Sequence, residues 1–259
     1  MKTRKLLTIA LSLAMVLSMV ACFASCGGNK NTEYFIGCTG PLTGDAASYG
    51  ISVQKGAKLA VKQINANGGL NGVNFKFDMK DDQAEAEPAQ TGYDTLYDAG
   101  MQISLGSVTS GSCKAFAAKA QQDNLLFMTP SASEAAILTD YAGGTTAFRV
   151  CFGDPDQGTL AAQEIKAKGY TKIGAIYDTS SSYSVGIYEA FKAEMAKQGL
   201  TYIETTFDAE NNKDFSTQVE TMKECEIIFM PFYYTEAALF IKTSVAKGCK
   251  AVFLGCDGF

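Results

Sequence analysis

The chain has 259 residues and a formal net charge of −5, from 22 basic and 27 acidic side chains, and it contains no histidine. The missing histidine removes the commonest general base and the commonest metal ligand, which argues against triad hydrolases and zinc enzymes. The acidic balance disfavours nucleic acid and anionic lipid surfaces as partners, because both are bound by clustered Lys and Arg.

The N-terminal segment has the pattern of an export signal. Lys2, Arg4 and Lys5 precede an apolar run over residues 6–21, which is too short to span roughly 30 Å of hydrocarbon comfortably. We predict a signal peptide over residues 1–25 and an extracytoplasmic location. Its removal takes away three basic and no acidic residues, which leaves 19 Lys and Arg against 27 Asp and Glu, a net charge of −8.

Two cysteines follow the apolar run, and one of them is expected to carry a lipid. Cys26, preceded by small residues and followed by two glycines, resembles the lipobox of bacterial lipoproteins, where the lipidated cysteine becomes the new N-terminus. We predict lipidation at Cys26, because a flexible linker over residues 26–32 starts there, and Cys22 is the alternative. A buried N-terminal helix with chance cysteines is the alternative to the export signal as a whole. The predicted protein is exported and anchored to the cell membrane.

Beyond the linker, short apolar runs alternate with longer amphipathic segments. This alternation predicts βαβ units and parallel sheets covered by helices. We expect two α/β lobes, over residues 33–145 and 146–259, with a crossover between them in 138–146. The predicted strands cover residues 34–39, 74–80, 101–105, 125–129, 147–151, 172–177, 201–207, 226–230 and 251–254. The predicted helices cover residues 51–67, 88–99, 112–122, 157–167, 184–197, 215–223 and 235–247.

The loops after the predicted strands are where a ligand is expected. In doubly wound parallel sheets, ligands bind beyond the carboxyl ends of the strands. These loops are rich in Ser, Thr, Asp, Tyr and Gly and hold no cluster of Lys, Arg or Cys. Their composition is typical of polar recognition rather than of catalysis.

Catalytic and metal-binding motifs are absent or weak. The sequence has no GxGxxG, GxxxxGK[ST] or GxSxG. Ser52 and Lys55 match the SxxK of penicillin-binding enzymes, but they lie inside a predicted helix, and we interpret the match as chance. The acidic residues of segment 81–87 are interpreted as a solvated turn rather than a cation site. We expect no catalytic residue, no metal and no cofactor.

Six cysteines lie beyond Cys26, and none forms a CxxC pair. Cys225 and Cys249 each precede an apolar run, and an exported location permits a disulfide between them. We interpret the six mainly as small buried hydrophobic residues, the commoner fate of a free cysteine. They are Cys38, Cys113, Cys151, Cys225, Cys249 and Cys256.

A series of motifs runs along almost the whole chain after the signal, and its order is more specific than any single member. The motifs include Gly40-Pro41-Leu42-Thr43-Gly44, Ser48-Tyr49-Gly50, Asn67-Gly68-Gly69, Asp81-Asp82-Gln83, Thr109-Ser110, Ser131-Ala132-Ser133, Asp154-Pro155-Asp156-Gln157-Gly158, Asp214-Phe215-Ser216 and Gly255-Cys256-Asp257-Gly258. This order resembles the type I periplasmic binding proteins that serve as substrate-binding components of branched-chain amino acid ABC transporters.

The resemblance implies a fold and a function. The fold is an α/β clamshell, in which two lobes with parallel sheets covered by helices close over a free amino acid. The function is that of a monomeric binding protein rather than an enzyme, delivering leucine, isoleucine or valine to the permease subunits of an ABC importer. A sensor or receptor module on the same fold is the alternative. An exported α/β hydrolase is a second rival, against which the missing histidine and GxSxG count.

The resemblance also assigns the ligand-binding residues. Those of the first lobe engage the ligand's α-carboxylate and α-amino groups, and Ser110 precedes a predicted helix whose N-terminal N–H groups form an anion site. The acids of the second lobe hold the α-ammonium group, and Tyr234 is the alternative to Tyr233. The assigned residues are Ser110, Ser131 and Ser133 in the first lobe and Asp154, Tyr183, Tyr233 and Asp257 in the second, and Tyr49 and Val108 face the ligand side chain.

Chains of this family continue well past the Gly-x-Asp-Gly motif at 255–258, cross back to the first lobe and complete both sheets. The present sequence ends at Phe259. The resemblance therefore implies a fragment, with the second lobe incomplete and the last part of the fold missing.

Overall fold

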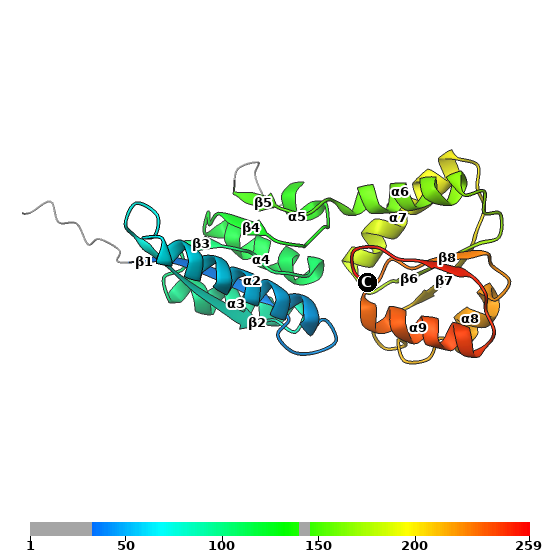
Figure 1. Ribbon diagram of the computed structural model, residues 1–259, viewed down its shortest axis with the longest axis horizontal. Coiled ribbons are helices and arrows are strands. Elements are labelled where there is room, and N and C mark those ends of the chain that lie inside the picture. The colour runs from blue at the N-terminus through cyan, green and yellow to red at the C-terminus, as the bar shows by residue number, and fades with distance from the viewer. Residues whose placement is uncertain (1–32, 140–145) are drawn as a thin grey trace, which may run out of the picture.

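The computed structural model describes residues 33–139 and 146–259, which form two α/β lobes lying side by side (Figure 1). The predicted signal peptide, the linker and both lipidation candidates, Cys22 and Cys26, lie outside the described residues. Within the described part of the chain, no helix combines the length and the apolar character needed to cross a membrane.

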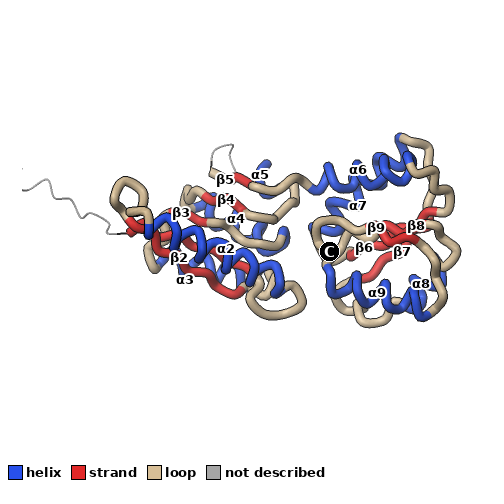
Figure 2. The backbone as a smooth tube through the Cα atoms, in the orientation of Figure 1, coloured by secondary structure: helices blue, strands red, loops and turns tan. Residues whose placement is uncertain are grey.

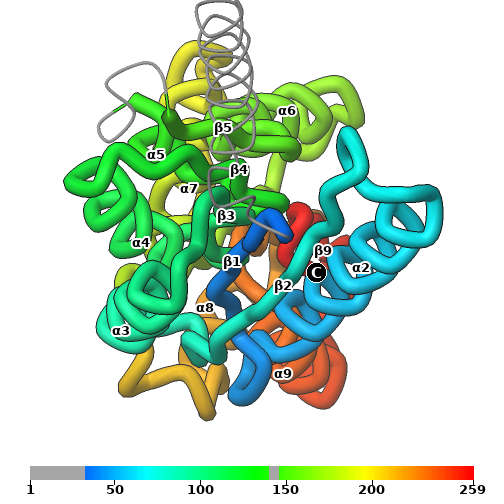
Figure 3. Tube along the Cα trace, turned by 90° about the vertical axis from the view of Figure 1, so that its left-hand side faces the viewer, coloured from blue at the N-terminus to red at the C-terminus, as the bar shows by residue number. Residues whose placement is uncertain are grey.

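The first lobe is built around a parallel sheet. Its elements in chain order are β1 (Glu33–Gly40), α2 (Ala47–Ala66), β2 (Asn74–Asp81), α3 (Ala86–Asp98), β3 (Ile103–Ser104), α4 (Ser110–Gln122), β4 (Phe127–Thr129), α5 (Ala136–Thr139) and β5 (Ala147–Arg149). The strand order is β2-β1-β3-β4-β5. Seen along the long axis of the molecule, α2 covers one face of this sheet, and α3 and α4 cover the other (Figure 3).

The second lobe repeats the plan with a four-stranded parallel sheet. Its elements are α6 (Asp154–Ala167), β6 (Ile173–Asp178), α7 (Ser182–Lys197), β7 (Ile203–Phe207), α8 (Ser216–Met222), β8 (Ile227–Phe229), α9 (Tyr234–Ala246) and β9 (Val252–Leu254), and the strand order is β7-β6-β8-β9. The sheet lies between α6 and α7 on one side and α8 and α9 on the other (Figure 2). Parallel sheets with helices on both faces confirm the predicted fold class.

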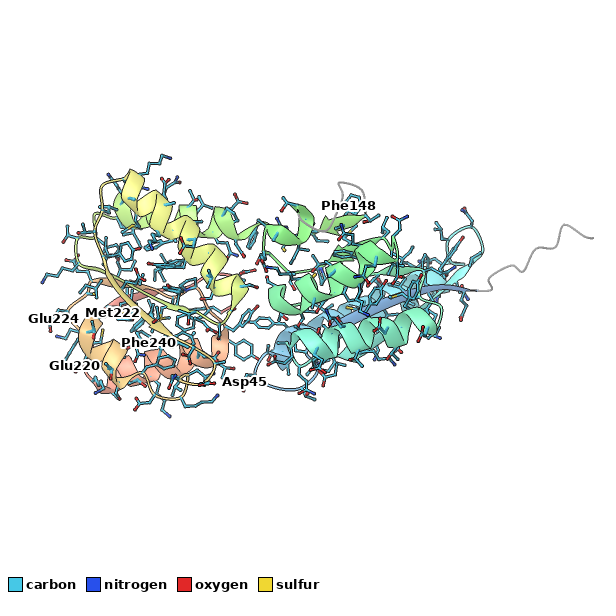
Figure 4. All side chains as sticks on the ribbon, turned by 180° about the vertical axis from the view of Figure 1, so that it is seen from behind. Asp45, Phe148, Glu220, Met222, Glu224 and Phe240 are labelled. Carbon is cyan, nitrogen blue, oxygen red and sulfur yellow. The ribbon has the colours of Figure 1, made fainter. Side chains whose placement is uncertain are left out.

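Each face of the second sheet has its own hydrophobic core. Met222 and Phe240, labelled in Figure 4, pack with Phe215 in the core under α8 and α9. Ile187 and Phe191 of α7 belong to a second core on the opposite face. Burial on both faces explains why these strands read as short, nearly continuous apolar runs in the sequence.

The boundary between the lobes lies later than predicted. Strand β5 pairs with β4 in the first sheet, from Phe127 opposite Ala147 to Thr129 opposite Arg149, although the sequence assigned residues from 146 onward to the second lobe. The strand that follows the predicted crossover at 138–146 therefore belongs to the first sheet. The described crossing between the lobes is the segment 150–153, which joins β5 to α6.

The two helices that cover one face of the second sheet meet at a glycine. A Cβ atom at Gly158 of α6 would lie 2.1 Å from the carbonyl oxygen of Ile187 and 2.6 Å from the amide nitrogen of Phe191, both in α7. No side chain fits at this distance, so the close crossing of α6 and α7 requires glycine.

Gly158→Ala is expected to lower the free energy of unfolding by about 1–3 kcal/mol, because the added methyl group forces α6 and α7 apart. Gly56→Ala in α2 is the matched control, since nothing lies within 4 Å of the added methyl group. Alanine favours helix more than glycine does, so the control should gain up to about 1 kcal/mol. Urea unfolding of both variants measures the difference, and equal effects would contradict the close packing.

Candidate functional site

A cavity lies between the two lobes, beyond the carboxyl ends of the strands. Its volume is about 50 Å³. Both lobes contribute hydroxyl groups and aromatic rings, and the second lobe adds one carboxylate. The lining residues are Tyr49, Val108, Thr109, Ser110, Ser131, Tyr183, Tyr233, Asp257 and Gly258.

The first-lobe wall is the N-terminus of α4 and the loop that follows β4. Ser110 is the first residue of α4, and its hydroxyl oxygen accepts the backbone N–H groups of Ser133 and Glu134 at 3.2 and 3.3 Å. Ser131 donates its hydroxyl proton to the carbonyl of Val108 at 2.7 Å. The N-terminal end of the 13-residue helix α4 carries a partial positive charge, so this wall favours a carboxylate.

The second-lobe wall presents a carboxylate held by a tyrosine. The hydroxyl group of Tyr183, in α7, donates to Asp257 Oδ1 at 2.5 Å, and its ring stacks on that of Tyr233 with centroids 4.7 Å apart. Burial raises the pKa of Tyr183, which therefore remains a protonated donor. The backbone N–H of Asp257 donates to Gln157 Oε1 at 3.0 Å. Asp257 itself is exposed, so it can meet a cation without a large desolvation cost.

Tyr49 joins the two walls. It comes from α2 in the first lobe, and its hydroxyl donates to the carbonyl of Gly258 in the second. Its ring packs against Tyr233 and Tyr234, with centroids 5.5 and 5.1 Å away. Burial raises the pKa of Tyr49, which keeps this donor protonated.

The structure separates the two neighbouring tyrosines that the sequence could not rank. Tyr233 lines the cavity. The hydroxyl of Tyr234 instead accepts the backbone N–H of Ser48 at 3.3 Å, on the outer side of the contact between the lobes. Thr235 donates to the carbonyl of Asp45 at 2.9 Å in the same place, and Figure 4 labels Asp45 near this boundary.

Seven of the nine predicted ligand-binding residues line the cavity, and two do not. Ser133 and Asp154 lie behind the wall, with 0% and 1% of their surface exposed. Asp154 points toward α7, because a Cβ at Gly186 would lie 2.8 Å from its Oδ2 atom. Burial raises the pKa of Asp154 to about 7, and the negative charges of Asp257 and Glu134 act in the same direction.

Two lining residues, Thr109 and Gly258, were not predicted. Both belong to motifs that the sequence analysis recognised, beside Ser110 and Asp257. Thr109 is the N-cap of α4, and the carbonyl of Gly258 accepts the Tyr49 hydroxyl. Gly258 has no side chain and contributes only backbone atoms, so its residue type could not identify it as a ligand-binding residue.

The weaker sequence motifs have structural explanations. The acidic turn is not simply solvated, because Asp82 is fully buried and accepts the Ser107 hydroxyl at 2.6 Å. Ser52 donates to the backbone carbonyl of Ser48 at 2.7 Å. In residues 33–139 and 146–259, no cluster of three or more His, Cys, Asp or Glu side chains could hold a metal ion.

The cysteines of the described residues are free. Four of them are buried, which confirms their interpretation as small hydrophobic residues: Cys38, Cys113, Cys225 and Cys249. The other two are partly exposed and lie near the cleft. Cys256 is one of these, and its sulfur lies 2.9 Å from the hydroxyl oxygen of Tyr183.

Comparison with known proteins identifies the family. The profile of the periplasmic binding proteins matches residues 33–258. The chain belongs to the periplasmic binding protein family. This confirms the resemblance inferred from the order of the polar loops, and it places the chain among solute-binding proteins rather than enzymes.

Several relatives carry names that refer to branched-chain amino acids. The chain is 29% identical to Leu/Ile/Val-binding protein homolog 3 of Brucella melitensis over 94% of its length and 67% of the relative's length. It is 28% identical to the branched-chain amino acid transporter substrate-binding protein LivJ of Streptococcus pneumoniae, solved in complex with isoleucine. The TM-score is 0.80, with 88% of this chain and 65% of LivJ covered.

The leucine-binding protein LivK of Thermotoga maritima shows the same fold, with a TM-score of 0.79 at 24% identity. The match covers 87% of this chain and 63% of LivK. The chain therefore spans roughly two thirds of the length of the relatives that it matches.

Proposed function

We propose that the protein is the substrate-binding component of an ABC importer and that it binds a free amino acid between its lobes. The observation that carries this proposal is the polarity of the cavity. The N-terminus of α4 with Ser110 forms one wall, and Asp257 lies in the other. A partial positive charge facing a carboxylate across a small cavity complements the carboxylate and ammonium groups of an amino acid.

Each predicted residue has a role in this proposal. Ser110 holds the α-carboxylate together with N–H groups of α4, and Ser131 joins them by turning its hydroxyl proton away from the Val108 carbonyl. Asp257 holds the α-ammonium group and Tyr183 orients it, while Tyr49, Val108 and Tyr233 face the ligand side chain. Ser133 and Asp154 lie behind the wall and act on the ligand through their neighbours.

The proposed ligand is leucine, isoleucine or valine. The names of the relatives support this choice, and so do the apolar faces of Tyr49, Val108 and Tyr233. A cavity of about 50 Å³ holds roughly three to five water molecules, which is the size of an amino acid head group. A branched side chain needs more room than this cavity offers, and an open space of about 780 Å³ between the lobes shares Thr109 and Tyr233 with it.

A thermal shift panel of amino acids, sugars and polyamines on the full-length protein tests the proposal. A ligand present at 100 times its Kd should add about 2.7 kcal/mol to the free energy of unfolding, an easily measured rise in Tm. We expect leucine, isoleucine or valine to give the largest rise. A panel in which sugars raise the Tm and no amino acid does would overturn the proposal.

The location is the second part of the proposal. Membership of the periplasmic binding proteins implies an extracytoplasmic protein. We further propose that it is a monomer, anchored by a lipid on Cys26 and delivering its ligand to permease subunits in the same membrane. The lipid anchor is supported by the sequence pattern of residues 1–32, and the monomeric state and the permease by the membership of the family.

Mass spectrometry of the mature N-terminal peptide is expected to show a lipid on Cys26. The linker that begins there leaves the anchored cysteine accessible, which is the physical reason for preferring it to Cys22. Cys26→Ala should then release the protein from the membrane, whereas Cys22→Ala should leave it anchored. A lipid on Cys22, or an unmodified chain cleaved elsewhere, would contradict the assignment.

A further inference from the structure

Asp154, the first residue of α6, is a buried carboxyl group without a hydrogen-bond partner. It is 1% exposed, and neither oxygen makes a hydrogen bond of good geometry to the residues that the structure describes, although the Ser133 hydroxyl lies close enough to lower the pKa of Asp154 in part. The hydroxyl of Ser133 is likewise buried and unpartnered, and the Ser133 carbonyl accepts the backbone N–H of Asp154 at 3.0 Å. Buried polar groups are normally hydrogen-bonded, so this carboxyl group requires an explanation.

The surrounding charges do not compensate an ionised Asp154. α7 faces it with Gly186, which carries no charge. Arg149 favours the ionised form of Asp154, but its guanidinium donates to the carbonyls of Ser133 and Glu134, at 2.7 and 3.2 Å, and the ammonium group of Lys114 lies 3.0 Å from Glu134 Oε1. The other titratable groups near it are acidic or neutral: Asp257, Glu134, Cys151, Cys256 and Tyr233.

We propose that Asp154 releases a proton when an amino acid binds at Asp257, so that ligand binding depends on pH. This inference rests on the proposed function, because it requires an ammonium group in the cavity. Before binding, the buried carboxyl group keeps its proton, since burial and two nearby acids oppose its ionisation. The ammonium group brings a positive charge beside both carboxyl groups and favours the ionised form of Asp154. The O–H bond of Asp154 then breaks, and the proton passes to the buffer.

The direction of the pH dependence follows from this order of events. The pKa of Asp154 in the unliganded protein is raised to about 7. Below this pH the proton has to be displaced before the ligand binds, so affinity should fall by up to about tenfold per pH unit. Above it the affinity levels off. We therefore expect a Kd at pH 6 that is about tenfold weaker than the Kd at pH 8.

Isothermal titration calorimetry with L-isoleucine on the full-length protein tests the coupling. The heat of binding is measured in two buffers with different ionisation enthalpies, and the difference gives the number of protons released. We expect close to one proton at pH 6, about half a proton at pH 7 and almost none at pH 8.

Asp154→Asn removes the titrating group and keeps the size of the side chain. The variant should release no proton and should show a Kd that is the same at pH 6 and pH 8. Asp98→Asn is the matched control, because Asp98 is exposed at the C-terminal end of α3 and is not among the residues that line the cavity. This control should release protons as the wild type does. Melting curves of the unliganded variants show whether they are folded. The number of protons released by the wild-type protein tests the coupling even if a variant does not fold.

The possible results separate the two proposals. Proton release in the wild type that is lost in Asp154→Asn supports the coupling. Binding of isoleucine with equal heats in both buffers at all three pH values overturns the coupling and leaves the proposed function intact. Proton release that persists in Asp154→Asn overturns the role of Asp154. Absence of isoleucine binding at every pH overturns both the proposed ligand and the coupling.

Discussion

Asp257→Asn is expected to weaken isoleucine binding by about 1.5–3 kcal/mol, roughly 10- to 150-fold in Kd. The substitution keeps the size and one hydrogen-bond acceptor of the side chain, so the Tyr183 hydroxyl retains its partner. It removes the negative charge that faces the ammonium group. Calorimetry of the full-length protein at pH 8 measures the effect without interference from protonation of Asp154.

Two further variants show whether this loss belongs to the ammonium group. Ser110→Ala should cost less, about 0.5–1.5 kcal/mol, because the N–H groups of α4 remain available to the carboxylate. Asp98→Asn should leave the Kd unchanged. Wild-type affinity in Asp257→Asn would show that the ammonium group is held elsewhere, with Asp154 the next candidate. Unchanged melting of the unliganded variants excludes a folding defect as the cause.

The alternation of strands and helices could be predicted because both sheets are parallel. Parallel strands buried on both faces appear as short apolar runs. In the helices between them, apolar residues recur every three or four positions. The predicted strand 172–177 differs from β6 (Ile173–Asp178) by one residue at each end, and the predicted helix 184–197 differs from α7 (Ser182–Lys197) only at its start.

The assignment of β5 to the first lobe could not be predicted from the same pattern. Strand β5 and the helix that follows it look like any other βα pair in the sequence. Which sheet β5 joins depends on its pairing with β4, a contact between residues about 20 positions apart. Apolar periodicity carries no information about that choice.

The start of α6 was also placed too late, although a signal existed. The predicted helix starts at residue 157, whereas the helix begins at Asp154 with Pro155 as its second residue. Proline is favoured in the first turn of a helix, because its missing N–H would have no partner there. Reading Pro155 in this way would have placed Asp154 at a helix N-terminus.

Most of the site could be predicted because its residues follow the ends of strands. The carboxyl ends of parallel strands meet at one edge of each sheet, so Ser110, Ser131 and Asp257 converge once the sheets form. The depth of each side chain could not be predicted in this way. Ser133 lies in the same loop as Ser131, and Asp154 begins α6 after β5, yet both side chains lie behind the cavity wall, with Asp154 directed toward Gly186 of α7.

The burial of Asp154 also has a consequence for folding. Its carboxyl group has a pKa near 3.9 in the unfolded chain and about 7 in the unliganded folded protein. Between these values the folded protein binds the additional proton. The free energy of unfolding therefore falls as the pH rises from about 4 to about 7, and the loss contributed by this group is complete above pH 7.

Asp154→Asn should accordingly stabilise the ligand-free protein at high pH and have little effect near pH 4. The full difference of about three pH units corresponds to at most about 4 kcal/mol, and the part that develops between pH 5 and pH 8 is about 2–3 kcal/mol. Urea unfolding of the wild type, Asp154→Asn and the exposed control Asp98→Asn at pH 5 and pH 8 measures this part. Parallel pH profiles for wild type and Asp154→Asn would show that Asp154 is ionised in the folded protein, with its charge compensated by water or by a movement of Arg149.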